Sequence, residues 1–271
     1  MLVSLATDSA PGRPNEDFAA ASDDLVVVLD GATVPGALET GCSHGTRWFA
    51  RALGVEIFRL AEDSNRNLVD SLAEAIKDLA DRHAHTCDVG HPGHPSATVA
   101  ILRETEDGFE YLVLADSTVA IETTASVQAI TDDRLDHVAT EYHDALNAAK
   151  NGSTEHATAV SSLTLALRQY RNVTGGYWVA AVDPDAAYEA ITGSVARNEV
   201  RSAAIMTDGA SIICDRFGVL DWPQVFHRLH EAGPMGLIRD VREQELSDST
   251  GERWKRSKVH DDATAVFCLP C

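Results

Sequence analysis

Short apolar runs and polar breaks alternate along most of this chain. The runs are rich in Val, Ile and Ala and are bounded by Gly, Pro, Asp or Ser, which is typical of β-strands. We predict strands over residues 2–7, 18–21, 25–29, 97–103, 111–115, 119–123, 127–131, 177–182, 202–206 and 263–269. The four strands between residues 97 and 131 follow one another with only polar turns between them, so we predict an antiparallel meander there.

Other segments repeat their apolar residues at helical spacing. One begins near Thr40 and carries Phe49, Leu53, Ile57 and Leu60 on one face, and the next carries Leu68, Leu72, Ile76 and Leu79. The short polar connection 65–67 predicts that these two helices pack antiparallel, with their stripes in the core. Further helices are predicted near the end of the polar segment 132–172 (Val160, Leu163, Leu167, Tyr170), from Pro184 through Ile191, from Asp221, and over 234–246.

Four of the predicted strands have a carboxylate at one end. The run 25–29 stops at Asp30-Gly31, the run 111–115 at Asp116, the run 202–206 is followed by Asp208-Gly209, and Asp261 precedes the last strand. Taken alone, Asp-Gly is a common turn dipeptide. The repetition favours a second interpretation, because a carboxylate beside a buried strand needs a compensating partner.

A divalent cation is the partner that these residue types favour. Asp30, Asp116, Asp208 and Asp261, together with Glu16-Asp17, offer hard oxygen ligands, which select magnesium, manganese or calcium over zinc. If the strands lie side by side, the carboxylates converge and repel one another, so that cations are required. Two ions about 3.5–4 Å apart would form the arrangement used for phosphoryl hydrolysis.

Composition excludes several classes of function. The chain has 271 residues, 42 acidic against 22 basic side chains, and a formal net charge of −20. This excess disfavours non-specific binding to nucleic acid or to an anionic membrane surface. We expect one domain over residues 1–271. The first residues lack the basic start of a signal peptide and no apolar run is long enough to span a bilayer, so we predict a cytoplasmic protein.

Cysteine, histidine and basic clusters give weaker signals. Five scattered cysteines without a CxxC pair favour a reduced compartment, and Cys268 with Cys271 lacks nearby partners for zinc. His91 and His94 could bind a metal, but the glycines and prolines of 83–95 favour a connector with solvated histidines. The basic run 253–258 could face an anionic substrate, although a solvated loop is the favoured interpretation.

The order of several short motifs resembles that of the metal-dependent protein phosphatases of type 2C, in particular bacterial members. The motifs are Arg13 with Asn15-Glu16-Asp17, Val28-Leu29-Asp30-Gly31, Ser96-Ala97-Thr98, Ala115-Asp116-Ser117, Thr131-Asp132-Asp133, Thr207-Asp208-Gly209 and Asp261-Asp262-Ala263-Thr264. The resemblance covers essentially the whole chain. It implies an α+β fold, a four-layer α-β-β-α sandwich of two packed antiparallel sheets flanked by helices.

The resemblance also implies roles for single residues. Asp30 would bridge two manganese or magnesium ions, with the Gly31 carbonyl on one ion and Asp208 and Asp261 on the other. Asp17 would act as a further ligand, and Glu16 and Asp262 would lie just behind the ligands. Asp116, with Asp208, would hold a third ion, and Arg13 would bind the phosphate.

The implied reaction is hydrolysis of phosphoserine or phosphothreonine by in-line attack of a hydroxide that bridges the two metal ions. The implied partners are a phosphoprotein substrate and a cognate Ser/Thr kinase. One departure leaves an alternative open. Ala32-Thr33-Val34-Pro35 stands where the family has a histidine or methionine and two glycines. A catalytically impaired module that binds phosphoprotein or metal as a regulator is therefore the second hypothesis.

Overall fold

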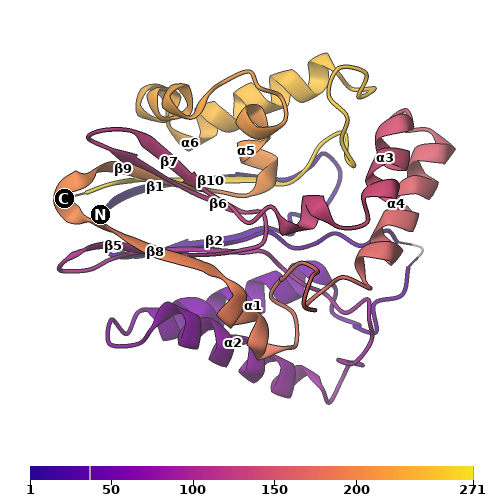
Figure 1. The fold of residues 1–271 in the computed structure, drawn as a ribbon, viewed down its shortest axis with the longest axis horizontal. Coiled ribbons are helices and arrows are strands. Elements are labelled where there is room, and N and C mark those ends of the chain that lie inside the picture. Colours follow the sequence, from indigo (N-terminus) through magenta and orange to yellow (C-terminus); the bar gives the residue numbers. More distant parts are fainter. Residues whose placement is uncertain (37, 271) are drawn as a thin grey trace.

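Two five-stranded antiparallel sheets pack face to face, and helices cover both outer faces (Figure 1). The structure is a computed structural model that describes residues 1–36 and 38–270, so Cys271 lies outside the described residues. The predicted α+β fold and its four-layer α-β-β-α sandwich are confirmed.

The first sheet has the strand order β1-β10-β9-β6-β7. Its strands are β1 (Leu2–Asp8), β6 (Thr118–Thr123), β7 (Val127–Ile130), β9 (Val200–Met206) and β10 (Ala263–Leu269). β1 pairs with β10 from Leu2 opposite Leu269 to Asp8 opposite Ala263. The beginning of β10 therefore lies beside the end of β1, although the two segments come from opposite ends of the sequence.

The second sheet has the order β2-β3-β4-β5-β8. Its strands are β2 (Phe18–Ala21), β3 (Leu25–Leu29), β4 (Val99–Glu104), β5 (Gly108–Leu114) and β8 (Ile191–Ala196). Every residue of β3 is buried, because Leu25, Val27 and Leu29 pack under helices while Val26 and Val28 face the other sheet. Burial on both faces explains why this strand is a continuous apolar run and not an alternating one.

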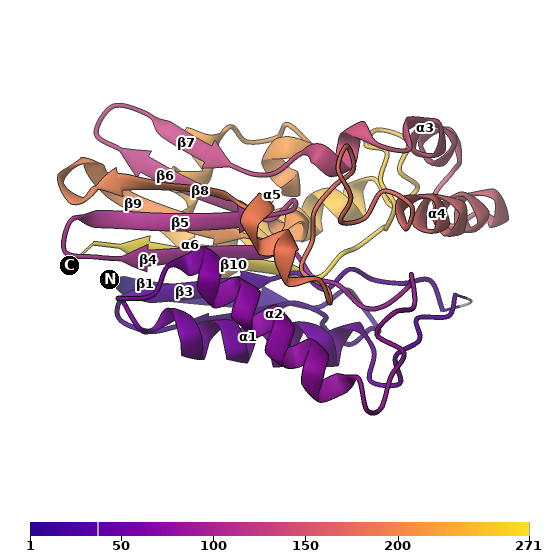
Figure 2. The ribbon, with the colours of Figure 1, turned by 60° about the horizontal axis from the view of Figure 1, so that its bottom comes forward.

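Helices α1 (Thr46–Ala61) and α2 (Leu68–His83) cover the second sheet (Figure 2). The residues of both predicted stripes are buried there, as expected. Helices α5 (Asp208–Asp215) and α6 (Trp222–Ser247) cover the first sheet. α6 is interrupted at Gly233, where φ is 67°, directly before Pro234, so the two helices predicted in this region are confirmed as the two halves of one interrupted helix.

Helices α3 (Thr140–Ala148) and α4 (Thr154–Leu167) stand together at one end of the sandwich (Figure 1). They pack on each other through a small cluster of their own that includes Leu146, Leu163 and Ala166. Only the second of these helices was predicted from the sequence, because α3 buries a single residue, Leu146, and so has no apolar stripe.

The predicted meander is wrong at one connection, between β5 and β6, which lie in different sheets. β4 and β5 form the expected hairpin, but β6 pairs with β7 and β9 in the other sheet. The chain therefore crosses between the sheets after Leu114. Ala115 lies at this crossing with φ 67°, a left-handed conformation that is uncommon for a residue with a side chain.

Two further predictions are wrong between residues 177 and 196. The segment 177–182 forms only isolated bridges, Ala97 with Ala180 and Arg171 with Tyr177, and not a strand. The helix predicted from Pro184 is a 3₁₀-helix that ends at Glu189, and β8 follows it. β8 is an edge strand whose side chains are mostly exposed, so it lacks the apolar signal by which the other strands are recognised.

The histidines of 83–95 do not all belong to a solvated connector. His83 is 2% exposed and His94 is 1% exposed, which overturns that prediction for these two side chains. Short 3₁₀-helices at Arg134–His137 and Arg197–Glu199 complete the described elements. Within the described residues, no helix combines the length and the apolar character that crossing a membrane requires.

Candidate functional site

The strand ends with carboxylates meet at the end of the sandwich where α3 and α4 stand. Asp30 follows β3, Asp208 follows β9 and Asp261 precedes β10. These three residues and Asp116 line one cavity of about 220 Å³. The convergence that the repeated pattern predicted is therefore present in the tertiary structure.

Two glycines allow this convergence. A Cβ atom on Gly31 would lie 2.7 Å from Thr46 Cγ2 and 2.8 Å from the Glu16 carbonyl oxygen. A Cβ atom on Gly209 would lie 1.9 Å from the Asp262 carbonyl oxygen. Both glycines are required by close backbone packing, and the second lets the first turn of α5, which begins with Asp208, approach the entry to β10.

Asp17 is buried, and its charge acts on Asp30, which lines the cavity. Its Oδ2 accepts hydrogen bonds from Thr207 Oγ1 at 3.0 Å and from Thr264 Oγ1 at 2.6 Å. Its Oδ1 is buried without a hydrogen-bond partner. Both threonines stand in motifs whose aspartates alone carry a recognisable signal, so these two hydrogen bonds could not be predicted from the sequence.

Burial and mutual repulsion shift the pKa values of the carboxylates around the cavity. Desolvation and the charges of Asp17, Asp208 and Asp261 raise the pKa of Asp30 well above its ordinary value. Desolvation raises the pKa of Asp17 and that of Asp116 to about 7. It also raises the pKa of Asp261 to about 6, against the opposing effect of Lys258. Each shift has the direction expected for carboxylates that share a poorly solvated site.

Lys258 lies among these carboxylates. Its Nζ donates to Asp261 Oδ1 at 2.6 Å and to Thr33 Oγ1 at 3.2 Å. Desolvation works to lower the pKa of Lys258, but the charges of Asp261, Asp30 and Asp208 raise it above its ordinary value. Its place in a basic run gives no local signal that it belongs to the site.

The basic run 253–258 is thus not the solvated loop that the sequence favoured. Trp254 and Arg256 are buried, and the Arg256 guanidinium donates to Asp248 Oδ2 at 3.1 Å. Trp254 Nε1 donates to the Phe217 carbonyl oxygen at 2.9 Å. This anchoring holds the following residues in place, Lys258 included.

The donor set fits a hard cation. Asp208 Oδ1, like Asp17 Oδ1, is a buried oxygen without a hydrogen-bond partner. Such an orphaned carboxylate oxygen is costly unless a cation compensates it. Among the described residues, however, one group of side chains is already close enough to hold a metal ion, and it lies elsewhere. It consists of Cys42, His44, His83 and Cys87, whose ligand atoms lie within 4.8 Å of one another. The carboxylates line the cavity, but no three of them in the described residues lie close enough together to hold a metal ion as they stand.

Glu16 and Asp262 support the site from outside the cavity. Asp262 Oδ1 and Oδ2 accept from the backbone N–H groups of Ala10 and Glu16, both at 2.8 Å, and so fix the loop between β1 and β2. The Glu16 carboxylate accepts from Thr33 Oγ1 at 2.6 Å. This fixed loop carries Arg13, whose side chain is exposed.

A larger cleft of about 1230 Å³ leads to the carboxylates. Asp116 and Asp208 lie in its lining, and α3 and α4 contribute one of its walls. Four cationic side chains also line it: Arg13, Arg216, Lys255 and Lys258. Asp136 and Asp144 line the cleft as well, so its four cationic side chains are matched by four carboxylates, and these cations are the groups there that can bind an anion.

Comparison with known proteins identifies the family. A sequence-family model described as protein phosphatase 2C matches residues 8–248. The chain belongs to the protein phosphatase 2C family. The resemblance noted in the motifs is confirmed, and the chain is accordingly a hydrolase of the serine/threonine phosphoprotein phosphatase class. No curated protein matches the chain in sequence.

Solved structures share the fold of this phosphatase. The catalytic domain of the serine/threonine protein phosphatase PstP, in complex with two manganese ions, is 14% identical, with TM-score 0.57 over 98% of this chain and 96% of that one. Mycobacterium tuberculosis PstP/Ppp is 13% identical, with TM-score 0.59 over 100% and 99%. Stp1 from Staphylococcus aureus is 12% identical, with TM-score 0.57 over 99% and 94%.

Proposed function

We propose that this phosphatase uses two divalent cations, manganese or magnesium, held by Asp30, the Gly31 carbonyl, Asp208 and Asp261. Asp17 would complete this ligand set, and Asp116 with Asp208 would hold a third ion. The observation that carries the proposal is the convergence of strand-end carboxylates on one cavity, with Asp17 Oδ1 and Asp208 Oδ1 left without partners. The manganese ions described for PstP support this choice of metal.

Bound cations would supply the positive charge that makes water a nucleophile near neutral pH and that stabilises the phosphoryl oxygens. The chain itself supplies the rest. The hydroxyl groups of Thr207 and Thr264 orient Asp17 and stabilise its charged form, which is the form that binds metal. Asp262 fixes the loop that presents Arg13 to the cleft, where a guanidinium can bind two phosphate oxygens at once.

The substrate class follows from the shape and charge of the cleft. It is open, has cationic side chains near the carboxylates, and extends along α3 and α4. A phosphoserine or phosphothreonine on a polypeptide fits such a cleft, because the phosphate can reach the cations while the peptide lies along the helices. We expect a phosphoprotein partner, phosphorylated by a cognate Ser/Thr kinase, and cytoplasmic localisation.

The test is activity against two substrates after metal removal and replacement. The metal-free chain is expected to be inactive, and manganese should restore hydrolysis of both an aryl phosphate and a phosphothreonine peptide. Asp208→Asn should lose most of this recovery, whereas Asp81→Asn, at an exposed surface ion pair, should not. Failure of the manganese-loaded chain to hydrolyse either substrate would overturn the proposal.

One observation favours the second hypothesis, a regulatory module that binds without turnover. The ammonium group of Lys258 already compensates part of the negative charge around Asp261. If it permanently replaces a cation, the chain should bind a phosphothreonine peptide tightly without hydrolysing it. Calorimetry with this peptide, in the presence and absence of manganese, distinguishes the two functions.

A further inference from the structure

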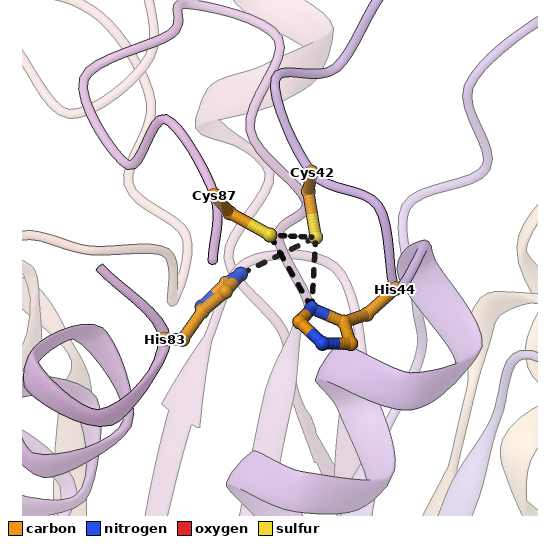
Figure 3. Close-up of side chains that lie close together, drawn as sticks. All are labelled: Cys42, His44, His83 and Cys87. Atoms are coloured by element: carbon orange, nitrogen blue, oxygen red, sulfur yellow. Dashed lines mark hydrogen bonds between the residues drawn. The ribbon is translucent and has the colours of Figure 1, made fainter. Parts of the chain in front are cut away.

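Four side chains gather at the ends of α1 and α2, outside the carboxylate cavity (Figure 3). Cys42 and His44 lie in the loop before α1, His83 is the last residue of α2, and Cys87 lies in the turn after it. Their ligand atoms all lie within 4.8 Å of one another. Figure 3 shows both sulfur atoms and the two imidazole rings facing a common point.

Four of the six separations between the ligand atoms are close to those of a tetrahedral metal site. The two sulfur atoms are 3.6 Å apart, and Cys42 Sγ lies 3.2 Å from His83 Nε2 and 3.8 Å from His44 Nδ1. Cys87 Sγ lies 3.3 Å from His44 Nδ1. Zinc bonds of about 2.3 Å to sulfur and about 2.0–2.1 Å to nitrogen give tetrahedral edges of about 3.8 Å between sulfurs and about 3.6 Å between sulfur and nitrogen.

We propose that Cys42, His44, His83 and Cys87 form a structural zinc site. Two thiolates and two imidazoles are a donor set that selects zinc over the hard cations of the carboxylate cavity. On binding, zinc displaces the two thiol protons to solvent, so the completed site carries no net charge and can be partly buried. Four protein ligands fill the coordination sphere, which leaves no open position for a substrate.

Neighbouring backbone and side-chain groups contact these four ligand residues and hold them in place. The backbone N–H of Ser43 donates to Cys87 Sγ at 3.3 Å, a contact that stabilises a thiolate. The His44 ring stacks on Trp48 with centroids 4.2 Å apart. The backbone N–H of Asp88 donates to the Gly41 carbonyl at 2.9 Å and ties the two ligand-bearing loops together. The ligand side chains are therefore positioned by their neighbours as well as by one another.

Zinc at this position would fix the connection between β3 and α1. That connection begins at Asp30, carries Thr33 to Gly36 along the wall of the cleft, and reaches Cys42 and His44 just before α1. α1 has no side-chain hydrogen bond at its N-cap, Gly45. Coordination by Cys42 and His44 would hold this helix end to the end of α2, which supports the loop beside the carboxylates.

A disulfide between Cys42 and Cys87 is the competing explanation. The sulfur separation of 3.6 Å is well beyond the bond length of about 2.05 Å, and the formation of a disulfide requires an oxidant. It would also leave unexplained why two imidazole nitrogens face the sulfurs.

The first experiment uses cobalt as a spectroscopic probe for zinc. The reduced full-length chain is titrated with Co²⁺, in the wild type and in Asp30→Asn, where the carboxylate site is impaired. We expect sulfur-to-cobalt charge-transfer bands and tetrahedral cobalt bands that saturate at one equivalent in both proteins and disappear when Zn²⁺ is added. Absence of sulfur-to-cobalt bands in the reduced protein would overturn the proposal.

Matched variants locate the site. Cys42→Ser and Cys87→Ser should lose the charge-transfer bands, while Cys214→Ser and His85→Ala should keep them, since neither residue belongs to the cluster. His44 is exposed, so His44→Ala should fold and should weaken zinc binding by more than about tenfold. Unchanged bands in both cysteine variants, or unchanged zinc affinity in His44→Ala, would contradict the assignment.

Thermal unfolding supplies a readout that does not depend on cobalt or on activity. Free zinc at about 100 times its dissociation constant should raise Tm by about 5 °C in the reduced wild type and in Cys214→Ser. The same zinc should leave the Tm of Cys87→Ser unchanged. An equal zinc-dependent increase in Cys87→Ser would show that zinc acts elsewhere and would overturn the proposal.

Discussion

The carboxylate cavity and the cysteine-histidine cluster, which we propose hold cations with residues distant in sequence, differ in the charge of their ligands. In the cavity, like charges lie around a poorly solvated space, and the pKa values of Asp17, Asp30 and Asp261 are raised as a result. In the cluster, the ligands are neutral as thiols and as singly protonated imidazoles, and their ligand atoms lie within 4.8 Å of one another. Neutral ligand atoms can approach a common point without repelling one another. Ionised carboxylates repel one another until a positive charge lies between them.

This difference predicts two separable metal dependences. The carboxylates should govern catalysis through manganese or magnesium, and the cluster should govern the stability of the adjoining loop through zinc. Each of the following experiments would break or refine that division.

The largest effect is expected from paired variants of the two clusters. Asp30→Asn should lower kcat for a phosphothreonine peptide by about 10³-fold, because it removes the carboxylate proposed to bridge both cations. Cys42→Ser should lower kcat by less than about tenfold. Steady-state kinetics at saturating manganese measures both. An equal loss in the two variants would show that the clusters act as one unit.

The second effect concerns pH and the unfolding free energy of the metal-free chain. The pKa of Asp116 is raised to about 7 in the folded state by desolvation and by Asp208, above its unfolded value near 4. The folded state therefore binds more protons than the unfolded state between these values, and this residue contributes stability at low pH that is lost as pH rises through about 7.

Asp116→Asn removes that contribution. Relative to the wild type, the variant should gain about 2 kcal/mol of unfolding free energy between pH 5 and pH 8, as measured by urea denaturation in chelator. An exposed control, Asp81→Asn, should show no such trend. A stability difference that does not change with pH would mean that Asp116 carries no raised pKa.

Lys258 should compete with the cations. Lys258→Met removes the ammonium group that donates to Asp261 at 2.6 Å, so the manganese concentration for half-maximal activity should fall about tenfold. Lys150→Met removes an exposed charge and serves as the control. If manganese binds more weakly to Lys258→Met, this lysine orients the ligands and does not oppose the metal.

The smallest effect is expected at Thr264. Thr264→Val removes the hydrogen bond of 2.6 Å to Asp17 and should lower the unfolding free energy by about 1–2 kcal/mol, with zinc-dependent stabilisation unchanged. Thr158→Val, on the exposed side of α4, is the control for the loss of a hydroxyl group. A loss of the zinc response in Thr264→Val would show that the two clusters are coupled.

The sequence made the carboxylate cavity recognisable because its parts are local patterns. An apolar run that ends in Asp or Asp-Gly can be read without knowledge of the fold, and the order of such runs pointed to the family. Lys258 could not be found in this way, since a lysine in a basic run has the same local signature whether it is solvated or enclosed. Its position depends on Trp254 and Arg256, which anchor that segment in the interior.

The cysteine-histidine cluster was missed for a related reason. Cys42 and His83 are 41 residues apart, and neither forms a compact metal-binding motif with its neighbours. The sequence contains the spacings Cys42-x-His44 and His83-x₃-Cys87, but each supplies only two of the four ligands that a tetrahedral zinc site needs.

Local patterns along the chain were enough to predict most of the buried strands, the two helices over the second sheet, the strand-end carboxylates and the phosphatase family. The packing of distant segments was needed to show that the chain crosses between sheets after Leu114, that Lys258 joins the carboxylates, and that the ends of α1 and α2 bring two cysteines and two histidines together. Periodicity and strand ends are properties of neighbouring residues. Contact between ligands from distant segments depends instead on how helices and sheets pack against one another.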